Sequence, residues 1–283
     1  MPDVRGTRKF DLHEFDPSTV GDNRICLFVG PRGTGKSTAM RAMLYQKRGI
    51  PSGICMSETE ESNKFWQKSV PLSFIYPEYD AEAVRLMIKR QRQKHRVVGD
   101  SGQLDPTFWV AEDVMGSGEL SKCKHARRVF VNGRQWNVFA LLALQYVTDL
   151  PPKFRGNVDF VFAFRPFSNN DREKLYDYFF SGAFDEWHDF RQTLKQTTED
   201  HMCLVLNNTV NSNDLEKKVF FWKAPVVGEF RAGDQGFWDH HFTNYKDAVE
   251  WDSEEEDPRV GVGNHRKIVV NKLPRLQAAG GSV

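Results

Sequence analysis

The sequence predicts an α/β fold with a mainly parallel central sheet and helices on both faces of that sheet. Short apolar runs alternate along the chain with helical segments, an order typical of parallel sheets covered by helices. The apolar runs are continuous, as expected for strands buried on both faces. A glycine-rich loop at 30–38 joins the first run to a helix, and ligands bind at such strand ends.

The elements follow from local patterns. Strands are expected at 25–29, 53–57, 72–76, 108–111, 138–144, 159–164, 201–206 and 218–222, the last two as a hairpin. Helices are expected at 37–46, 80–96, 120–132, 170–180 and 185–195. Asp80 is a suitable N-cap for one helix, and Asn170 with Glu173 resembles a capping box for another.

Composition places limits on function. The chain has 283 residues and a formal net charge of +1, so any contact with nucleic acid must come from a local basic patch. Its four cysteines are scattered without zinc-site spacing, which favours reduced thiols. No signal peptide is expected at the start. The longest apolar run, Val138 to Leu144, is too short to span a bilayer. We therefore expect a soluble, intracellular protein with no membrane-spanning segment.

The loop after the first strand has the pattern of a P-loop. Its glycines allow a tight turn that aims backbone N–H groups at phosphate, the lysine reaches the β- and γ-phosphates, and the serine hydroxyl can hold Mg²⁺. This context predicts a nucleotide site. Its candidate binding residues are Gly30, Pro31, Arg32, Gly33, Thr34, Gly35, Lys36, Ser37 and Thr38.

Two later strand ends carry polar residues suited to nucleotide hydrolysis. The strand at 108–111 runs into Glu112 and Asp113; one carboxylate can orient the metal and the other can polarise the attacking water. Gln145 ends the next strand, where it could sense the γ-phosphate or position water. Ser37 and Glu112 are the candidate metal ligands.

Several arginines are candidates for contact with phosphate. Arg32 lies inside the P-loop and could act in cis, whereas Arg127, Arg128, Arg134 and Arg155 lie near later strand ends. One of these could serve a neighbouring subunit as an arginine finger. Each could equally be a solvated surface charge.

Four segments together resemble a known family. They are the P-loop GPRGTGKST (30–38), the strand end FWVAED (108–113), the string RRVFVNGRQWNVFALLALQY (127–146) and PPKFRGNVDFVFAFR (151–165). These segments are similar to the genome-packaging ATPases of large double-stranded DNA viruses, the poxvirus-type branch of the FtsK–HerA superfamily. The resemblance covers roughly residues 20 to 210 and implies a RecA-like P-loop NTPase fold.

The resemblance assigns roles position by position. Lys36 and Ser37 match the nucleotide-binding pair, Asp113 matches the second acid of the Walker B motif, and Gln145 matches the sensor. Either Arg134 or Arg155 would be the trans-acting arginine. The first Walker B acid is usually Asp in this family, whereas here it is Glu112, which leaves the division of roles between the two acids open.

The family also implies ATP and Mg²⁺ as cofactors and a homo-oligomeric ring around double-stranded DNA. ATP hydrolysis would then drive DNA, without sequence specificity, into a preformed capsid, with a portal or vertex protein as a further partner. It implies a location in the host cytoplasm or virus factory, or association with the virion. The stretch Gly116 to Arg128, with Lys122, Lys124 and Arg127, is a candidate DNA-contacting loop.

These expectations divide the chain into a lead-in (1–22), an ATPase domain (23–223), and a C-terminal appendage with a flexible tail (224–283). Three other functions stay open at this point: a small-molecule kinase built on the same P-loop, a nucleotide-dependent protein switch, and a homologue that binds nucleotide without turnover. The acidic pair and the following Gln favour activation of water over transfer to a substrate.

Overall fold

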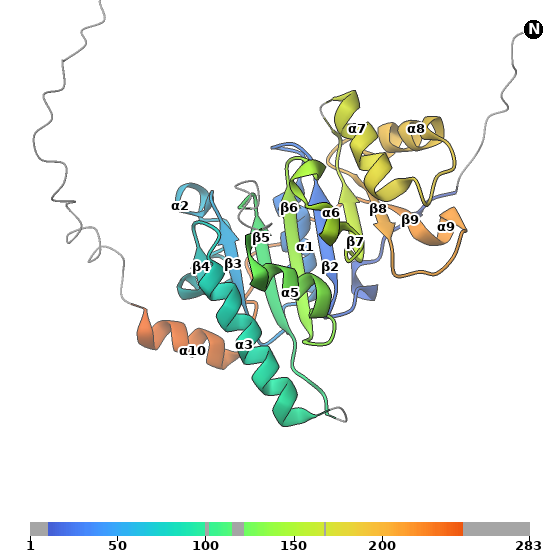
Figure 1. The fold of residues 1–283 in the computed structure, drawn as a ribbon. Coiled ribbons are helices and arrows are strands. Elements are labelled where there is room, and N and C mark those ends of the chain that lie inside the picture. The colour runs from blue at the N-terminus through green and yellow to red at the C-terminus, as the bar shows by residue number, and fades with distance from the viewer. Residues whose placement is uncertain (1–10, 100–101, 115–121, 167, 246–283) are drawn as a thin grey trace, which may run out of the picture. The chain divides into compact units, whose positions relative to one another are not determined.

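A computed structural model describes residues 11–99, 102–114, 122–166 and 168–245. Within these ranges the strands form one sheet in the order β1-β9-β8-β7-β2-β6-β5-β3-β4 (Figure 1). Their bounds are β1 (His13–Glu14), β2 (Ile25–Val29), β3 (Ser52–Ser57), β4 (Ile75–Tyr76), β5 (Thr107–Glu112), β6 (Val138–Leu144), β7 (Phe160–Ala163), β8 (Cys203–Asn207) and β9 (Val219–Trp222). Only β8 runs antiparallel to its neighbours. The predicted mainly parallel α/β fold is confirmed.

Helices cover both faces of the sheet. The helices are α1 (Lys36–Gln46), α2 (Glu60–Asn63), α3 (Ala81–Val98), α5 (Lys124–Asn132), α6 (Pro152–Arg155), α7 (Asn169–Leu175), α8 (Trp187–Thr197), α9 (Leu215–Lys218) and α10 (Gln235–Asn244); 3-10 turns span Pro17–Thr19, Leu72–Phe74 and Val147–Asp149, and a π-helical turn spans Tyr176–Phe180. The helices α1 and α10 share one core cluster, whereas α3, α5, α6, α7 and α8 share the other.

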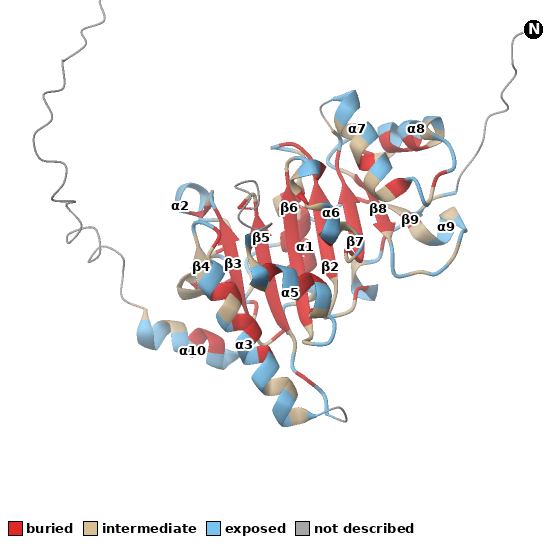
Figure 2. Ribbon diagram, in the orientation of Figure 1, coloured by how far each residue is buried: buried red, intermediate tan, exposed pale blue. Residues whose placement is uncertain are grey.

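The central strands are buried along their whole length, as Figure 2 shows for β2, β6 and β5. Successive side chains point to opposite faces of the sheet, so Phe28 of β2 packs in the α1 cluster and Leu27 packs in the α3 cluster. Both clusters are apolar, and the strands consequently carry continuous rather than alternating hydrophobic sequence.

Some local predictions need correction. The expected strand at 72–76 is reduced to Ile75–Tyr76, because Leu72–Phe74 forms a 3-10 turn after Pro71. The helix expected from Asn170 begins instead at Asn169, because Ser168 and Asp171 form a capping box. The Ser168 hydroxyl accepts from the backbone N–H of Asp171 at 3.0 Å, and the Asp171 carboxylate accepts from the backbone N–H of Ser168 at 3.3 Å. The expected hairpin is confirmed, because β8 pairs antiparallel with β9.

The segment after β9 packs on the main body of the chain. Phe237 of α10 lies 4.4 Å from Phe74 and 6.1 Å from Phe108, measured between ring centroids, and the Trp238 indole donates to the carbonyl of Ala232 at 2.9 Å. The two compact units of the chain are Met1–Tyr245 and Lys246–Val283. Phe237 therefore contacts the sheet through Phe108 of β5. The division of the chain after residue 223 stays a prediction.

The second unit lies outside the described residues, and so does the tail that was expected to be flexible. In the part of the chain that the structure describes, no helix has the length and apolar character needed to cross a membrane.

Candidate functional site

The P-loop connects the end of β2 to the start of α1. The Gly30 N–H donates to the carbonyl of Leu144 at 3.1 Å, which ties the loop to the end of β6. A Cβ at Gly30 would lie 2.7 Å from the Cβ of Phe164, so only glycine fits this close approach. Gly35 has φ of 103° and directly precedes α1, a conformation that glycine adopts at little cost. The loop therefore presents the N-terminus of α1 as an anion site.

Lys36 is buried inside this loop, with 5% of its surface exposed. Its ammonium group donates to the carbonyl oxygens of Gly30 at 2.7 Å and Pro31 at 3.0 Å. Burial lowers the pKa of Lys36, and the nearby carboxylates of Asp113 and Glu112 oppose that shift. A charged group that can neutralise a bound phosphate is thus held in place within the loop.

The remaining P-loop residues differ in burial, and their contact with nucleotide stays a prediction. The Thr34 hydroxyl donates to the Pro31 carbonyl at 2.8 Å, which braces the turn. Arg32 is exposed, while Ser37 and Thr38 are half-buried in the first turn of α1. His201 was not singled out from the sequence, yet its Cβ lies 3.4 Å from where a Cβ on Gly35 would stand.

Glu112 is a buried carboxylate with three hydrogen-bond donors. The Ser37 hydroxyl donates to Oε1, while the Ser57 hydroxyl at 3.2 Å and the Trp66 indole N–H at 2.6 Å donate to Oε2. Glu112 is 5% exposed, and hydrogen bonds to a buried charge fix its orientation firmly. The predicted partners Ser37 and Glu112 therefore do meet.

Two of these donors were missed from the sequence. Ser57 ends β3 and stands opposite Glu112 in the β3–β5 register, so a polar residue at that strand end was a usable signal. Trp66 follows α2 in an irregular segment, and its fully buried indole has no sequence pattern that connects it to Glu112. Its backbone N–H is in turn held by the Glu60 carboxylate at 2.8 Å.

Asp113 has a different environment from Glu112. It has φ of 55° just beyond β5, and its Oδ2 accepts from the Gln145 amide at 3.3 Å. Its Oδ1 is buried and has no hydrogen-bond partner among the described residues. A buried, unpartnered carboxylate oxygen is costly in a folded protein, and at a site of this kind it is positioned to accept a hydrogen bond from water.

The sheet order explains how Gln145 comes to this place. β6 lies between β2 and β5, so the residue that follows β6 stands between the P-loop and the acidic pair. Gln145 also lines a small pocket together with Gly30, Pro31, Tyr146, Phe164 and Asp171. The structure thus brings Lys36, Ser37, Glu112, Asp113 and Gln145 to one edge of the sheet.

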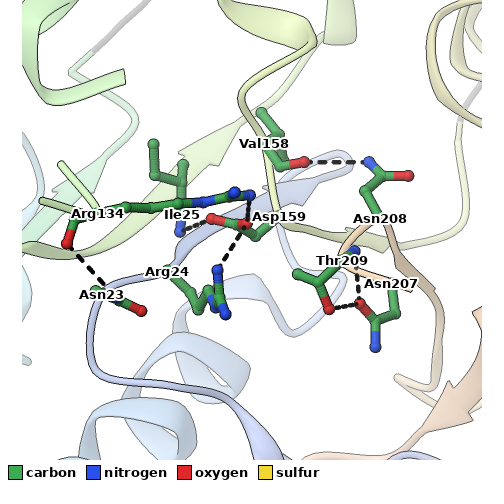
Figure 3. A network of polar contacts seen from close by, with 9 residues as sticks. All are labelled: Asn23, Arg24, Ile25, Arg134, Val158, Asp159, Asn207, Asn208 and Thr209. Atoms are coloured by element: carbon green, nitrogen blue, oxygen red, sulfur yellow. Dashed lines mark hydrogen bonds and ion pairs between the residues drawn. The ribbon is translucent and has the colours of Figure 1, made fainter. Parts of the chain in front are cut away.

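Arg134 lies at the opposite edge. Its guanidinium pairs with Asp159, whose Oδ2 also accepts from the backbone N–H of Ile25 at 2.9 Å (Figure 3). Ile25 is the first residue of β2, whereas the P-loop follows the last. Arg24 adds a second cation at 3.6 Å from the same carboxylate. Asp159 is fully buried, so Arg134 helps to neutralise a buried charge.

Arg155 does not reach the P-loop of its own chain either. It ends α6, donates to the carbonyl of Leu150 at 3.1 Å, and stacks over the Tyr178 ring at 3.4 Å from the ring centroid. Within one chain, neither Arg134 nor Arg155 joins the site. A trans-acting role for either residue stays a prediction.

The expected DNA-contacting stretch is described only in part. Residues 115–121 lie outside the described residues. Lys124 and Arg127 are exposed on α5, and Lys122 is exposed just before it. Their role stays a prediction.

The site offers a donor set that fits Mg²⁺. Ser37 and Glu112 supply hydroxyl and carboxylate oxygens, the ligands that magnesium prefers, and the unpartnered oxygen of Asp113 lies on the same strand end. No group of three or more His, Cys, Asp or Glu residues forms a metal cage in the described ranges. Such a sparse set suits magnesium that is completed by water and substrate phosphates.

Comparison with known proteins places the chain among viral proteins. It is 33% identical over 227 residues to uncharacterized protein 075L of Invertebrate iridescent virus 6, an alignment that covers 78% of this chain and 86% of the relative. It is 27% identical over 271 residues to uncharacterized protein L437 of Acanthamoeba polyphaga mimivirus, covering 92% and 89%. No family model matches the chain.

A solved structure shares the fold. The genome packaging NTPase B204 from Sulfolobus turreted icosahedral virus 2, in complex with AMPPCP, superimposes with a TM-score of 0.51 over 73% of this chain and all of B204. The two sequences are 14% identical. The likeness establishes a RecA-like P-loop ATPase fold.

Proposed function

The chain belongs to the family of large DNA virus proteins that includes protein 075L of Invertebrate iridescent virus 6, and we propose that it is an ATP-hydrolysing motor that translocates double-stranded DNA. One observation carries the proposal. The P-loop, the acidic pair and Gln145 follow three neighbouring parallel strands and meet at one edge of the sheet. This arrangement supports hydrolysis rather than binding alone, because it adds a carboxylate and an amide to the phosphate cradle.

The roles of the two acids follow from their surroundings. Glu112 accepts hydrogen bonds from three donors, one of which is the Ser37 hydroxyl. We therefore assign it to the metal side of the site, where it orients Ser37. Bound magnesium would neutralise charge on the phosphates. Asp113 keeps a free buried oxygen, which suits it to accept a proton from the attacking water.

Gln145 and Lys36 complete the proposed chemistry. The Gln145 amide donates to Asp113 at 3.3 Å, and from its place beside the P-loop it can hold the attacking water or report on the γ-phosphate. Lys36 exchanges its two loop carbonyls for phosphate oxygens, so that its positive charge stabilises the charge on the transferring group.

We assign the packaging of a viral genome into a preformed capsid as the biological task. The relatives belong to large DNA viruses, and B204, which shares the fold, is a genome packaging NTPase. The same proposal includes a homo-oligomeric ring with ATP sites between subunits. It also includes Arg134 or Arg155 as the residue that acts in trans, and a portal or vertex protein as partner. So does a location in the host cytoplasm, virus factory or virion.

The test is steady-state ATP hydrolysis by the full chain with and without linear double-stranded DNA, with Lys36→Ala as control. We expect DNA to stimulate turnover and the control to be inactive under both conditions. A hydrolysis rate that does not change with DNA would overturn the motor in favour of a protein switch. Transfer of phosphate to a small acceptor, in place of hydrolysis, would overturn it in favour of a kinase.

A further inference from the structure

Residues that follow β7, together with residues of α7 and α8, line a basic hollow. Figure 1 shows these three elements near one another. The volume of the hollow is about 260 Å³. Arg191 and Lys195 are four residues apart on α8 and so project from one face of that helix. The hollow is lined by Arg165, Pro166, Arg172, Arg191, Leu194, Lys195 and Thr198. Four of these residues are cationic and none is acidic.

The four cations are not neutralised by the protein. In the described ranges, the side chains of Arg165, Arg191 and Lys195 have no ion pair or hydrogen bond, and the Arg172 side chain donates only to the amide oxygen of Asn169, at 2.9 Å. Some other exposed cations do have a carboxylate partner; Lys217, for example, pairs with Asp214 at 3.1 Å. Like charges gathered without a counter-charge repel one another, and an anionic ligand relieves that repulsion.

The chemistry of the hollow selects phosphate. Three of the four cations are arginines, whose planar guanidinium groups match phosphate oxygens in a bidentate way. The fifth polar lining residue, Thr198, already has a partner, since its hydroxyl donates to the carbonyl of Leu194 at 2.6 Å. The hollow consequently offers charge and little else, which suits a ligand that is recognised by its backbone and not by its bases.

The hollow is also joined to the P-loop by one residue. Phe164, directly before Arg165, donates its backbone N–H to the carbonyl of Val29 at 2.8 Å. Its Cβ would lie 2.7 Å from a Cβ on Gly30, and its ring would lie 3.6 Å from a Cβ on Gly35. An anion bound at Arg165 is therefore one residue away from a side chain that packs on two P-loop glycines.

We propose that this hollow binds the phosphodiester backbone of double-stranded DNA and that Phe164 links this contact to the nucleotide site. The inference rests on the proposed motor function, which it extends by naming the surface that holds the DNA. Contact through cations alone gives binding without sequence preference and with strong salt dependence.

The experiment measures binding of a labelled linear duplex to the full chain, with AMPPCP present, across a series of salt concentrations. The test variant is Arg172→Gln/Arg191→Gln/Lys195→Gln. The matched control is Lys89→Gln/Arg92→Gln/Arg96→Gln, which removes the same three charges from exposed positions on α3. Unchanged AMPPCP affinity and unchanged thermal unfolding establish that both variants are folded.

We expect the magnitude of the negative slope of log affinity against log salt to be smaller by about 2 to 3 in the hollow variant, since each lost phosphate contact removes about 0.9. Its affinity at low salt should fall by about tenfold or more, while the α3 control changes the slope by less than about 1. Loss of DNA stimulation in the hollow variant, with basal hydrolysis intact, would support the link through Phe164.

Other outcomes overturn the inference in distinguishable ways. Wild-type DNA binding by the hollow variant, or equal losses in both variants, would overturn the inference alone and leave the motor standing. Binding of inorganic phosphate or poly-glutamate that depends on the hollow, with duplex affinity unchanged, would reassign its ligand to a free phosphate or an acidic protein. A wild-type chain that hydrolyses ATP but binds no duplex would overturn both proposals.

Discussion

Replacing Glu112 with Gln should destabilise the fold, because its carboxylate serves three donors at once. A Gln side chain has one carbonyl oxygen and one NH₂ group, so its NH₂ must face either Ser37 or the pair formed by Ser57 and Trp66. At least one hydrogen bond to a charged group is lost, worth about 1.5–3 kcal/mol. When the NH₂ faces Ser57 and Trp66, it also meets the indole N–H, so that two donors face each other. We expect the free energy of unfolding to fall by roughly 2–4 kcal/mol.

Replacing Asp113 with Asn should leave stability nearly unchanged. The Asn carbonyl can keep the bond from Gln145, and its NH₂ takes the place of the oxygen that has no partner among the described residues. Asn also tolerates the φ of 55° at this position. The expected loss of stability is below about 1 kcal/mol. Turnover should nevertheless fall by about 10²–10⁴-fold, because an amide cannot accept the proton from water.

The two variants are compared by urea unfolding, nucleotide affinity and ATP turnover in parallel. The assignment of roles requires that Glu112→Gln lose both stability and turnover, and that Asp113→Asn lose turnover alone. Equal destabilisation by both substitutions would show that the hydrogen-bond network around Glu112 does not differ in strength from that of Asp113. Full turnover in Asp113→Asn would remove that residue from the chemistry.

Three further outcomes are expected. Trp66→Phe removes the 2.6 Å indole donor and should weaken Mg²⁺-dependent nucleotide binding more than metal-free binding, measured by calorimetry; equal weakening of both would contradict its positioning role. Asp159→Ala leaves the buried N–H of Ile25 without its acceptor and should lower the free energy of unfolding in urea by about 1–3 kcal/mol. Arg134→Ala should lower it by less than about 1 kcal/mol, because that side chain is 58% exposed. Equal losses in the two variants would refute this account. Nucleotide affinity should fall as pH rises through the lowered pKa of Lys36, since nucleotide binding must then return a proton to the Lys36 amine. Calorimetry that detects no proton uptake on binding at alkaline pH would contradict this prediction.

Local sequence was enough for most of the fold. The continuous apolar runs at 25–29, 108–111 and 138–144 became β2, β5 and β6 within one residue or so of their expected ends. The P-loop was equally readable, because its strand, glycines, lysine and helix are consecutive in the chain. The N-cap expected at Asn170 lies two residues earlier, at Ser168, since both residues are acceptable N-caps and only the observed bonds choose between them.

The sequence by itself determined where each strand ends and which polar residue stands there: Ser37 after the loop, Glu112 and Asp113 after β5, and Gln145 after β6. It could not determine which of these would touch, because hydrogen-bond partners can be far apart in the chain. Trp66, in the irregular segment after α2, is 46 residues from Glu112 at the end of β5. Strand order put Gln145 beside Asp113. Arg134 precedes β6 and therefore lies at the opposite edge, where it pairs with Asp159, which in turn holds Ile25, 134 residues away. Short-range patterns follow from backbone geometry and hydrophobic periodicity. Long-range partners follow from how buried surfaces and buried charges are satisfied together, and that is settled only when the whole sheet packs.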